Sequence, residues 1–224
     1  MELRLPAVTE PVNTRRYDSS KRRAVAVERR RRIVDTAAQL FLANGYARTT
    51  TAEIAQSSGV SNDLIFRLFG SKRGILKEVM DYVIGGDDED IAVLDRPEPE
   101  AVRQCSDQRE QLQLFSIGIT KQLARVAPYS ALVQAAAAVE PEIEGLWADL
   151  NLRQRRTSMT TVAEWLADNG PLRDSKTVED AAAILWTLTS SDVYLMLTND
   201  WQWTTAQYEQ WLLQMLLAAL VPER

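Results

Sequence analysis

Apolar residues first recur at the spacing of an amphipathic α-helix between residues 24 and 44. The residues that share one helical face there are Ile33, Ala37, Leu40 and Phe41. Gly45 predicts the end of this helix, because glycine readily adopts the left-handed conformation of a C-cap. Residues 1–23 are polar, show no helical period and contain two prolines, so we expect them to form a flexible basic arm.

Glycines divide residues 50–84 into three shorter predicted helices. Thr50 and Glu53 match a capping box, in which the threonine hydroxyl accepts the Glu53 amide and the carboxylate accepts the Thr50 amide. Ser61 and Ser71 are suited to begin the two helices that follow. The predicted helices cover residues 51–58, 62–68 and 71–84.

An acidic, proline-containing stretch is predicted to form a linker over residues 85–106. Helical patterning then returns, and Pro128 and Pro141 each suit the first turn of a helix, where a missing amide costs no hydrogen bond. The later helices are predicted over residues 107–126, 128–139, 141–167, 176–198 and 205–220. No segment has the alternating, β-branched pattern of a strand, so we expect an all-α fold.

The most informative local pattern lies in residues 50–76. Ala55 is a small residue where two crossing helices would touch, and Gly59 lies at the corner between them. The apolar residues that would hold the crossing are Ile54, Val60, Ile65 and Leu68. This arrangement predicts a helix-turn-helix, whose second helix enters the major groove of DNA. A helical hairpin inside a protein core is the alternative interpretation of the same pattern.

Net charge changes sign between the two parts of the chain. The sequence has 26 Lys and Arg against 31 Asp and Glu, a net charge of -5. Residues 1–84 hold 15 basic and 9 acidic residues, or +6, and residues 85–224 hold 11 and 22, or -11. The basic part is therefore expected to meet a polyanion such as nucleic acid. Its arginine-rich arm could follow DNA phosphates or enter a minor groove, or it could be a disordered tail.

The order and spacing of these features resemble the tetracycline-repressor-like (TetR) transcriptional regulators over residues 28–80. The similarity rests on the helix IVDTAAQLFLANGY, the segment TTAEIAQSSGVS, a short recognition helix that ends at Phe69, and the Gly-Ser-Lys that follows. The resemblance implies an N-terminal three-helix helix-turn-helix domain and a larger C-terminal helical domain for ligand binding and dimerisation. We expect the boundaries to be 1–23 for the arm, 24–84 for DNA binding, 85–106 for the linker and 107–224 for the C-terminal domain.

Candidate DNA contacts come from helix N-termini, whose amides and hydroxyls suit phosphate oxygens, and from side chains that could read base edges. Asn62 and Arg67 suit adenine and guanine edges respectively, and Lys72 would place a charge near phosphate. Serines and threonines at helix N-termini could also serve as caps alone. The full set of candidates is Arg48, Thr50, Thr51, Ser61, Asn62, Asp63, Phe66, Arg67 and Lys72.

The predicted recognition helix departs from the pattern of the family that it resembles. Phe66 and Leu68 stand where such regulators often have tyrosines that reach phosphate, and Asp63 places a negative charge toward the duplex. Arg67 could supply one of the missing phosphate contacts. Ile65 and Phe69 are expected to face the core of the small domain.

The same resemblance implies an apolar cavity in the larger domain that takes a small apolar effector. Aromatic and aliphatic side chains recur there at helical spacing, although a stripe of this kind is also the usual signature of a plain core. The candidate ligand-binding residues are Leu112, Phe115, Ile119, Tyr129, Trp147, Met159 and Trp165.

The last predicted helix is apolar around most of its circumference, with Gln214 as almost its only polar residue after Trp211. Such a helix must be covered on more than one side. Paired with helix 176–198, it would form half of an intermolecular four-helix bundle in a homodimer, as the resemblance implies. The candidate interface residues are Trp186, Tyr194, Tyr208, Trp211, Met215 and Leu216, and packing within one subunit is the alternative account of these side chains.

Composition limits the chemistry that is available to the chain. There is no histidine and only one cysteine, Cys105, which excludes imidazole catalysis and a tetrahedral sulfur site for zinc. We expect no enzyme activity, no metal and no cofactor. A lone cysteine fits a reducing, cytoplasmic setting, and no apolar run reaches the roughly 18 to 20 residues of a membrane span, so no membrane partner is expected.

Together these inferences predict a ligand-responsive transcriptional regulator that acts as a repressor. A dimer would bind a pseudo-palindromic double-stranded DNA operator, and a small apolar effector would release it. The helix over residues 71–84, which joins the two domains, is the predicted lever. The alternative is an all-helical binding or scaffold protein with a degenerate helix-turn-helix, which Asp63 and the missing tyrosines favour.

Overall fold

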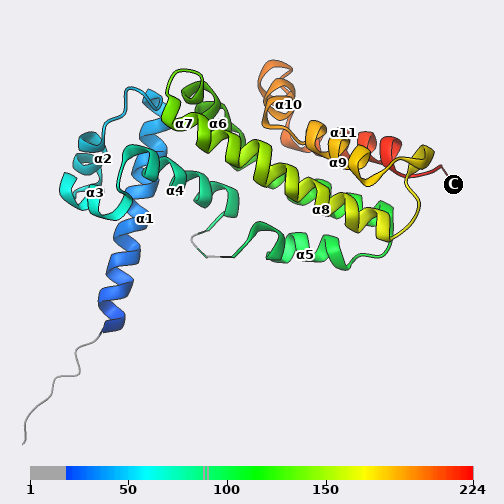
Figure 1. Ribbon diagram of the computed structural model, residues 1–224, viewed down its shortest axis with the longest axis horizontal. Helices are drawn as coiled ribbons and strands as arrows, with labels where there is room; N and C mark the ends of the chain where they lie inside the picture. Colours follow the sequence, from blue (N-terminus) through cyan, green and yellow to red (C-terminus); the bar gives the residue numbers. More distant parts are fainter. Residues whose placement is uncertain (1–18, 88, 90, 224) are drawn as a thin grey trace, which may run out of the picture.

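The computed structural model describes residues 19–87, 89 and 91–223, and all regular elements in that part of the chain are helices, as expected (Figure 1). The N-terminal helices are α1 (Ser19–Asn44), α2 (Thr51–Ser58), α3 (Asn62–Phe69) and α4 (Lys72–Gly85). The remaining α-helices are α5 (Pro97–Gln104), α6 (Gln108–Ala137), α7 (Pro141–Ala148), α8 (Arg155–Asp168), α9 (Val178–Leu188), α10 (Ser191–Leu195) and α11 (Thr205–Leu220). Short 3₁₀ turns at Val93–Asp95 and Arg173–Ser175 and π turns at Asp149–Gln154 and Met196–Asp200 link some of them.

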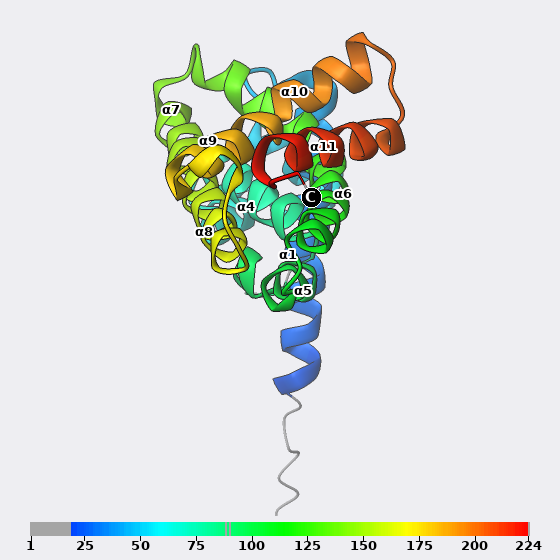
Figure 2. The ribbon, with the colours of Figure 1, turned by 90° about the vertical axis from the view of Figure 1, so that its right-hand side faces the viewer.

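The helices form two parts along the long axis of the molecule, a small N-terminal part and a larger domain (Figure 1). Figure 1 shows α2 and α3 at one end, and α8, α9 and α11 extending to the other. Figure 2, which views that far end, shows α8 and α9 on one side of the larger domain, α6 on the other and α5 below. The helix α4 lies between the two parts, with its N-terminus near α3 and its C-terminus toward α5 and α6.

Local caps fix the ends of the small helices as the sequence predicts. The Thr50 hydroxyl accepts the Glu53 amide at 3.1 Å, and the Glu53 carboxylate accepts the Thr50 amide at 2.8 Å, which completes the capping box. The side chains of Ser61 and Ser71 cap α3 and α4. Gly59 ends α2 with a φ of +69°, a left-handed conformation that glycine adopts without steric cost.

One apolar core joins the N-terminal helices to the larger domain. It contains buried side chains from α1 to α4, among them Ile33, Phe41, Ile54, Ile65 and Leu76. Val133 of α6 and Ile143 and Leu146 of α7 belong to the same core. The N-terminal helices therefore pack directly on α6 and α7, so a shift in either part changes contacts in the other.

The first helix begins earlier than its apolar pattern indicates. We expected it to start near residue 24, but α1 begins at Ser19, and residues 1–18 of the predicted arm lie outside the described residues. Residues 21–29 are exposed, so no apolar face marks this part of the helix. Lysine, arginine and alanine have high helix propensity and can extend a helix that is anchored further along.

The predicted break at Pro128 is wrong, because α6 runs without interruption from Gln108 to Ala137 with Pro128 inside it. A proline inside a helix removes one backbone hydrogen bond. Here its ring is exposed, while Leu123, Ala127 and Val133 on either side are buried. Tertiary packing on both sides therefore maintains the helix.

The predicted linker is also partly wrong, because residues 97–104 form α5. Pro97 occupies the first turn, and Val102 is buried in the core of the larger domain. The nearby Gln111 of α6 donates from Nε2 to the Val102 carbonyl at 3.0 Å. The helix was missed because a single buried residue among acidic and proline residues gives no helical period.

The expected helix 176–198 is divided in two at Thr189 and Ser190. Thr189 is fully buried, and the Ser190 hydroxyl accepts the Val193 amide at 3.1 Å to begin α10. By length and mean hydropathy (1.2) alone, the segment Val178–Asp200 is the one described stretch that could cross a membrane. In the structure it is interrupted at this break and packs against α6 and α8. The last helix, α11, has the predicted bounds.

Candidate nucleic-acid interface and internal cavity

The helix α3 presents one polar face and one apolar face. Asn62, Asp63 and Arg67 are exposed, and Phe66 is 48% exposed beside them. The opposite side places Ile65 and Phe69 in the core, as the spacing predicts. This is the two-sided arrangement that a recognition helix needs, because one face must hold the fold while the other remains free for a groove.

The crossing of α2 and α3 has the predicted contacts. Ala55 is 4% exposed at the junction, and its carbonyl accepts the Val60 amide at 2.9 Å. Ile54 and Ile65 are fully buried beneath it. The alternative of a hairpin enclosed in a core does not fit, because the outer face of α3 is open.

Hydroxyl groups at the start of α2 are engaged within the protein. The Thr50 hydroxyl and amide both bind Glu53, so capping is its role in this structure. These hydrogen bonds lower the pKa of the Glu53 carboxyl, which is therefore ionised at neutral pH. Thr51, in the first turn, is half-buried. Arg48 is exposed and donates from Nε to the Asn44 carbonyl at 2.8 Å.

Lys72, at the start of α4, is held against Tyr46. Its ammonium donates to the Tyr46 carbonyl at 3.0 Å and lies 4.1 Å from the centre of the ring. Two of its three N–H donors remain for other acceptors. The group is thus fixed in position next to α3, which suits a phosphate contact better than a freely rotating lysine.

Three arginines of the basic run connect α1 to the other N-terminal helices. Arg30 binds Glu78 of α4 and lies 4.7 Å from the centre of the Phe69 ring. Arg31 donates to the Tyr82 hydroxyl at 2.8 Å, and Arg32 donates to the Ser58 carbonyl at 3.1 Å. This part of the run stabilises the domain.

Tyr46 also joins the small domain to α7. Its hydroxyl donates to the Glu142 carboxylate at 2.7 Å, and Arg73 of α4 donates to the Glu142 carbonyl at 2.8 Å. Burial raises the pKa of Tyr46 well above its ordinary value, and the hydrogen bond to Glu142 adds to the effect. The phenol is therefore a permanent donor to this carboxylate at physiological pH.

Replacing Tyr46 by phenylalanine is expected to lower the free energy of unfolding by about 1 to 2 kcal/mol, because one charge-assisted hydrogen bond is lost. Thermal unfolding should shift down by roughly 2 to 8 °C for a chain of this length. Tyr129→Phe is the matched control, because no hydrogen bond of the Tyr129 hydroxyl is formed with the described residues. Equal melting temperatures for the two variants would contradict the role given to Tyr46.

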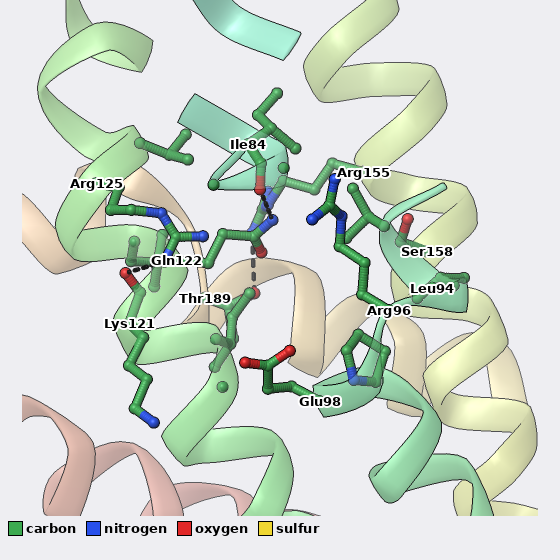
Figure 3. Close-up of a pocket in the computed structure, with 18 of the residues that line it drawn as sticks. Ile84, Leu94, Arg96, Glu98, Lys121, Gln122, Arg125, Arg155, Ser158 and Thr189 are labelled. Atoms are coloured by element: carbon green, nitrogen blue, oxygen red, sulfur yellow. Dashed lines mark hydrogen bonds between the residues drawn. The ribbon is translucent and has the colours of Figure 1, made fainter. Parts of the chain in front are cut away.

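The larger domain encloses a cavity of about 560 Å³ between the end of α4, α5, α6 and α8 (Figure 3). This volume lies in the usual range for small-molecule sites. Four of the candidate ligand-binding residues line it: Phe115, Ile119, Met159 and Trp165. The other three do not: Leu112 is buried in the core of the larger domain, whereas Tyr129 and Trp147 pack against the core shared with α1 to α4. Helical spacing alone could not separate cavity walls from core.

The C-terminus of α4 forms one wall of this cavity. Gln122 of α6 donates from Nε2 to the Ile84 carbonyl at 3.1 Å, and Arg125 donates to the Val83 carbonyl at 3.5 Å. A Cβ atom on Gly85 would lie 2.8 Å from Nη2 of Arg96. The last turn of α4 is therefore held by side chains that themselves face the cavity.

Arg96, between α4 and α5, is fixed by an ion pair. Its guanidinium donates to both carboxylate oxygens of Asp87, at 2.7 and 2.9 Å. These hydrogen bonds lower the pKa of Asp87 to about 2, so the pair stays intact at neutral pH. Arg96 closes the cavity beside Gly85 and Leu94.

Arg155, the first residue of α8, is a cavity-lining cation that the sequence did not reveal. It donates through Nη2 to the Trp186 carbonyl and, at 3.1 Å, to the Thr189 hydroxyl. Burial lowers the pKa of Arg155 to about 10, which leaves it protonated at neutral pH. It belongs to the sequence RQRR, which has the appearance of a solvated helix face, so no local signal marks its burial.

Only part of the expected dimer interface is exposed in this chain. Three candidates are buried within the protomer, as the alternative of packing within one subunit predicts: Tyr194, Tyr208 and Leu216. The ring of Trp186 lies 5.1 Å from the Arg155 guanidinium, on the side of α9 that faces α8. Trp211 is half-buried and Met215 is 38% exposed. Of the six candidates, these last two remain for contact with a partner.

No group of three or more acidic or cysteine side chains able to hold a metal ion occurs within residues 19–87, 89 and 91–223. Cys105 is a half-buried free thiol. The charged groups around the cavity are arginines, lysine and isolated carboxylates. A mostly apolar lining with a few polar and charged groups is typical of small-molecule sites.

Sequence comparison identifies the N-terminal helices. Residues 33–79 match the family model described as bacterial regulatory proteins, tetR family. A segment of 50 residues is 44% identical to the uncharacterized HTH-type transcriptional regulator YvkB of Bacillus subtilis, over 22% of this chain and 26% of the relative. The matched segment thus spans about a quarter of that relative. The residues that match the family model lie in the part of the chain that carries α1 to α4.

Comparison with solved structures extends the likeness to most of the chain. A protein described as a transcriptional regulator from Saccharomonospora viridis, in complex with choline, is similar with a TM-score of 0.65 and 21% identity, over 88% of this chain and 100% of that one. FadR of Bacillus subtilis in complex with stearoyl-CoA gives a TM-score of 0.61 and 17% identity, over 84% and 97%. The matched proteins are described as transcriptional regulators and not as enzymes. Residues 33–79 are therefore identified as a DNA-binding domain of the tetR-family type, and the fold of the matched regulators extends over most of the chain.

Proposed function

We propose that this protein is a ligand-responsive repressor that binds an operator through α3 and releases it when a small molecule fills the cavity. The observation that carries the proposal is the position of α4. Its N-terminus follows the exposed recognition helix, and its last turn forms a wall of the cavity. One rigid element thus touches both sites, which is the physical connection that allosteric coupling requires.

In the proposed mechanism, DNA is released when the ligand changes the hydrogen bonds between α6 and the last turn of α4. Gln122 and Arg125 hold the carbonyls of the last turn of α4 from within the cavity wall. A ligand that draws either side chain toward itself favours a different position of this turn. Because α4 is packed on α1 and joined to α3, its movement changes the spacing of the recognition helices.

The ligands of two structural neighbours support a small-molecule effector. One is in complex with choline and the other with stearoyl-CoA. These compounds differ in charge and size, so they support the presence of a ligand in general. The chemistry of this chain's ligand is inferred from the lining of its own cavity. No cofactor or membrane is part of the proposal, and the regulator would act in the cytoplasm.

The proposed operator complex contains a homodimer. In α9 and α11, which pack on each other, apolar side chains remain partly exposed: Ile184, Leu188, Leu213, Met215 and Leu217. Two copies joined through these helices would form a four-helix bundle. A two-fold dimer would present two α3 helices to half-sites about 34 Å, or a multiple of that distance, apart on the DNA.

Titration of DNA binding with salt tests the proposal. The probe is the intergenic duplex beside the protein's own gene, compared with a shuffled duplex of equal length and composition. The protein should prefer the intergenic duplex, and its affinity should fall linearly with the logarithm of salt concentration, because bound phosphates release counterions. A folded dimer that binds neither duplex at low salt would favour the scaffold function instead.

Replacing Arg67 by alanine is expected to weaken operator binding by about 1 to 3 kcal/mol if the guanidinium reads a guanine. If it contacts only phosphate, the loss should be similar for all sequences, and the salt slope should decrease by about 1. Fluorescence anisotropy at several salt concentrations separates the two cases. Arg153→Ala removes the same charge from an exposed position after α7 and should leave both affinity and slope unchanged. Equal behaviour of the two variants would remove Arg67 from the interface.

A further inference from the structure

The cavity contains a half-buried cation, Arg155, that forms no ion pair with the described residues. Arg155 donates to the Trp186 carbonyl and the Thr189 hydroxyl, both of which are neutral, and forms no ion pair with any described residue. Arg96 in the same cavity differs, because both of its terminal nitrogens bind Asp87. Arg155 is thus a cavity arginine without an ion pair, and Asp192 is the carboxylate that acts on its charge from a distance. Arg125, the third arginine of the cavity, also donates only to backbone carbonyls, those of Val83 and Lys121.

An uncompensated buried charge is costly for a folded protein, and such groups are usually found paired. The two neutral acceptors of Arg155 lie at the C-terminus of α9, where the helix dipole gives partial compensation. Both acceptors use the same nitrogen, Nη2. The N–H groups on Nε and Nη1 form no hydrogen bond with the described residues, so each is left as a single donor to another acceptor.

The face of α8 that borders the cavity changes from polar to apolar along its length. Arg155 and Ser158 lie at its start, and Met159, Val162 and Trp165 follow at the spacing of one helical face. Figure 3 shows the Arg155, Arg96 and Gln122 side chains directed into the cavity from three different elements. The wall formed by α8 is thus polar and cationic at its start and apolar beyond it. Carboxylates lie on another part of the lining, at Asp87, Glu89 and Glu98.

We propose that the effector of this protein is an apolar carboxylic acid whose carboxylate pairs with Arg155 and whose apolar body lies along α8 toward Trp165. A carboxylate can accept a charge-assisted hydrogen bond from the Nε–H or from Nη1 of the guanidinium. This inference rests on the proposed function, and it changes the expectation of a purely apolar effector to that of an amphipathic acid. A choline-like cation is disfavoured, because it would meet the Arg155 charge at close range.

Three probes with the same ten-carbon chain test the proposal in the wild-type protein: decanoate, 1-decanol and decyltrimethylammonium. Binding is followed by titration calorimetry. Decanoate should bind at least about tenfold more tightly than decanol, a difference of about 1.4 kcal/mol, and decyltrimethylammonium should bind most weakly. Equal affinities, tightest binding of the cation, or no binding of any probe to folded protein would overturn the proposal.

Substitution of Arg155 tests whether this residue causes the preference for decanoate over decanol. Arg155→Gln should lower decanoate affinity at least about tenfold and leave decanol affinity within about twofold, so that the preference disappears. Arg155→Lys keeps the charge and should retain most of the preference. Arg156→Gln is the matched control, because the neighbouring arginine is exposed on the outside of α8 and should not affect either probe. A decanoate preference that survives in Arg155→Gln would place the carboxylate elsewhere.

The proposal on the ligand class and the proposal on the regulatory function are contradicted by different results. If decanoate binds through Arg155 and DNA affinity does not change, the inferred ligand chemistry stands and the proposed function is wrong. If DNA binds specifically and another compound releases it without any dependence on Arg155, the proposed function stands and the carboxylate proposal is wrong. Both measurements use the full chain and the same intergenic duplex.

Discussion

Replacement of Gly74 by alanine is expected to lower the free energy of unfolding by about 3 kcal/mol and to abolish most DNA binding. A Cβ atom at this position would lie 2.0 Å from the carbonyl oxygen of Phe69. That oxygen is backbone, and it also accepts the Ser71 amide at 2.8 Å, so it cannot move aside cheaply. The end of α3 or the start of α4 must therefore shift, which displaces the recognition helix.

The matched control is Gly145→Ala in α7, where nothing lies within 4 Å of the added Cβ. This variant should be neutral or more stable by up to about 1 kcal/mol, because alanine is the better helix former. Circular dichroism during heating should show a decrease of roughly 6 to 12 °C for Gly74→Ala and no decrease for Gly145→Ala. Similar melting temperatures for both variants would mean that α3 and α4 are packed less tightly around Gly74 than a distance of 2.0 Å to the Phe69 carbonyl oxygen implies.

Replacement of Gly118 by tryptophan is expected to eliminate ligand binding, with a loss of at least about 100-fold, and to leave operator binding intact. Gly118 lies on α6 and lines the cavity, and its first side-chain atom would meet only Cβ of Glu98, at 3.9 Å. There is space for a side chain to enter, and an indole would take up a substantial part of the cavity of about 560 Å³. The variant should therefore bind DNA without responding to any effector.

Gly118→Ala separates filling of the cavity from loss of glycine. A single methyl group in ordinary contact with Glu98 should leave ligand affinity within a few fold of the wild type. The comparison is made by thermal shift with decanoate and by DNA binding in its presence and absence. If Gly118→Trp retains full ligand affinity, the effector binds outside this cavity.

Features that depend on neighbouring residues could be predicted from the sequence. The caps at Thr50, Ser61 and Ser71 are formed by hydrogen bonds over three residues, so a short pattern contains all the necessary information. The burial of Ile65 and the exposure of Arg67 follow from helical period within α3. For this reason the exposed face of α3 could be predicted from the sequence.

Features that depend on packing between distant segments could not be predicted. The continuity of α6 through Pro128 depends on buried residues on both sides, and α5 is held largely by Val102. The apolar stripe did not show that Tyr129 contributes to a core while Phe115 lines a cavity. Arg155 became a candidate only when α9 was placed beside it, 31 residues away in the sequence.

In the proposed regulator, α4 couples the cavity to the DNA-binding surface. The coupling is measured as the dissociation constant of the operator duplex across a titration with a compound that raises the melting temperature of the protein. Saturating ligand should weaken DNA binding at least about fivefold, and bound DNA should weaken ligand binding by the same factor, because coupling is reciprocal. A cavity ligand that stabilises the protein and leaves the DNA dissociation constant unchanged would contradict it.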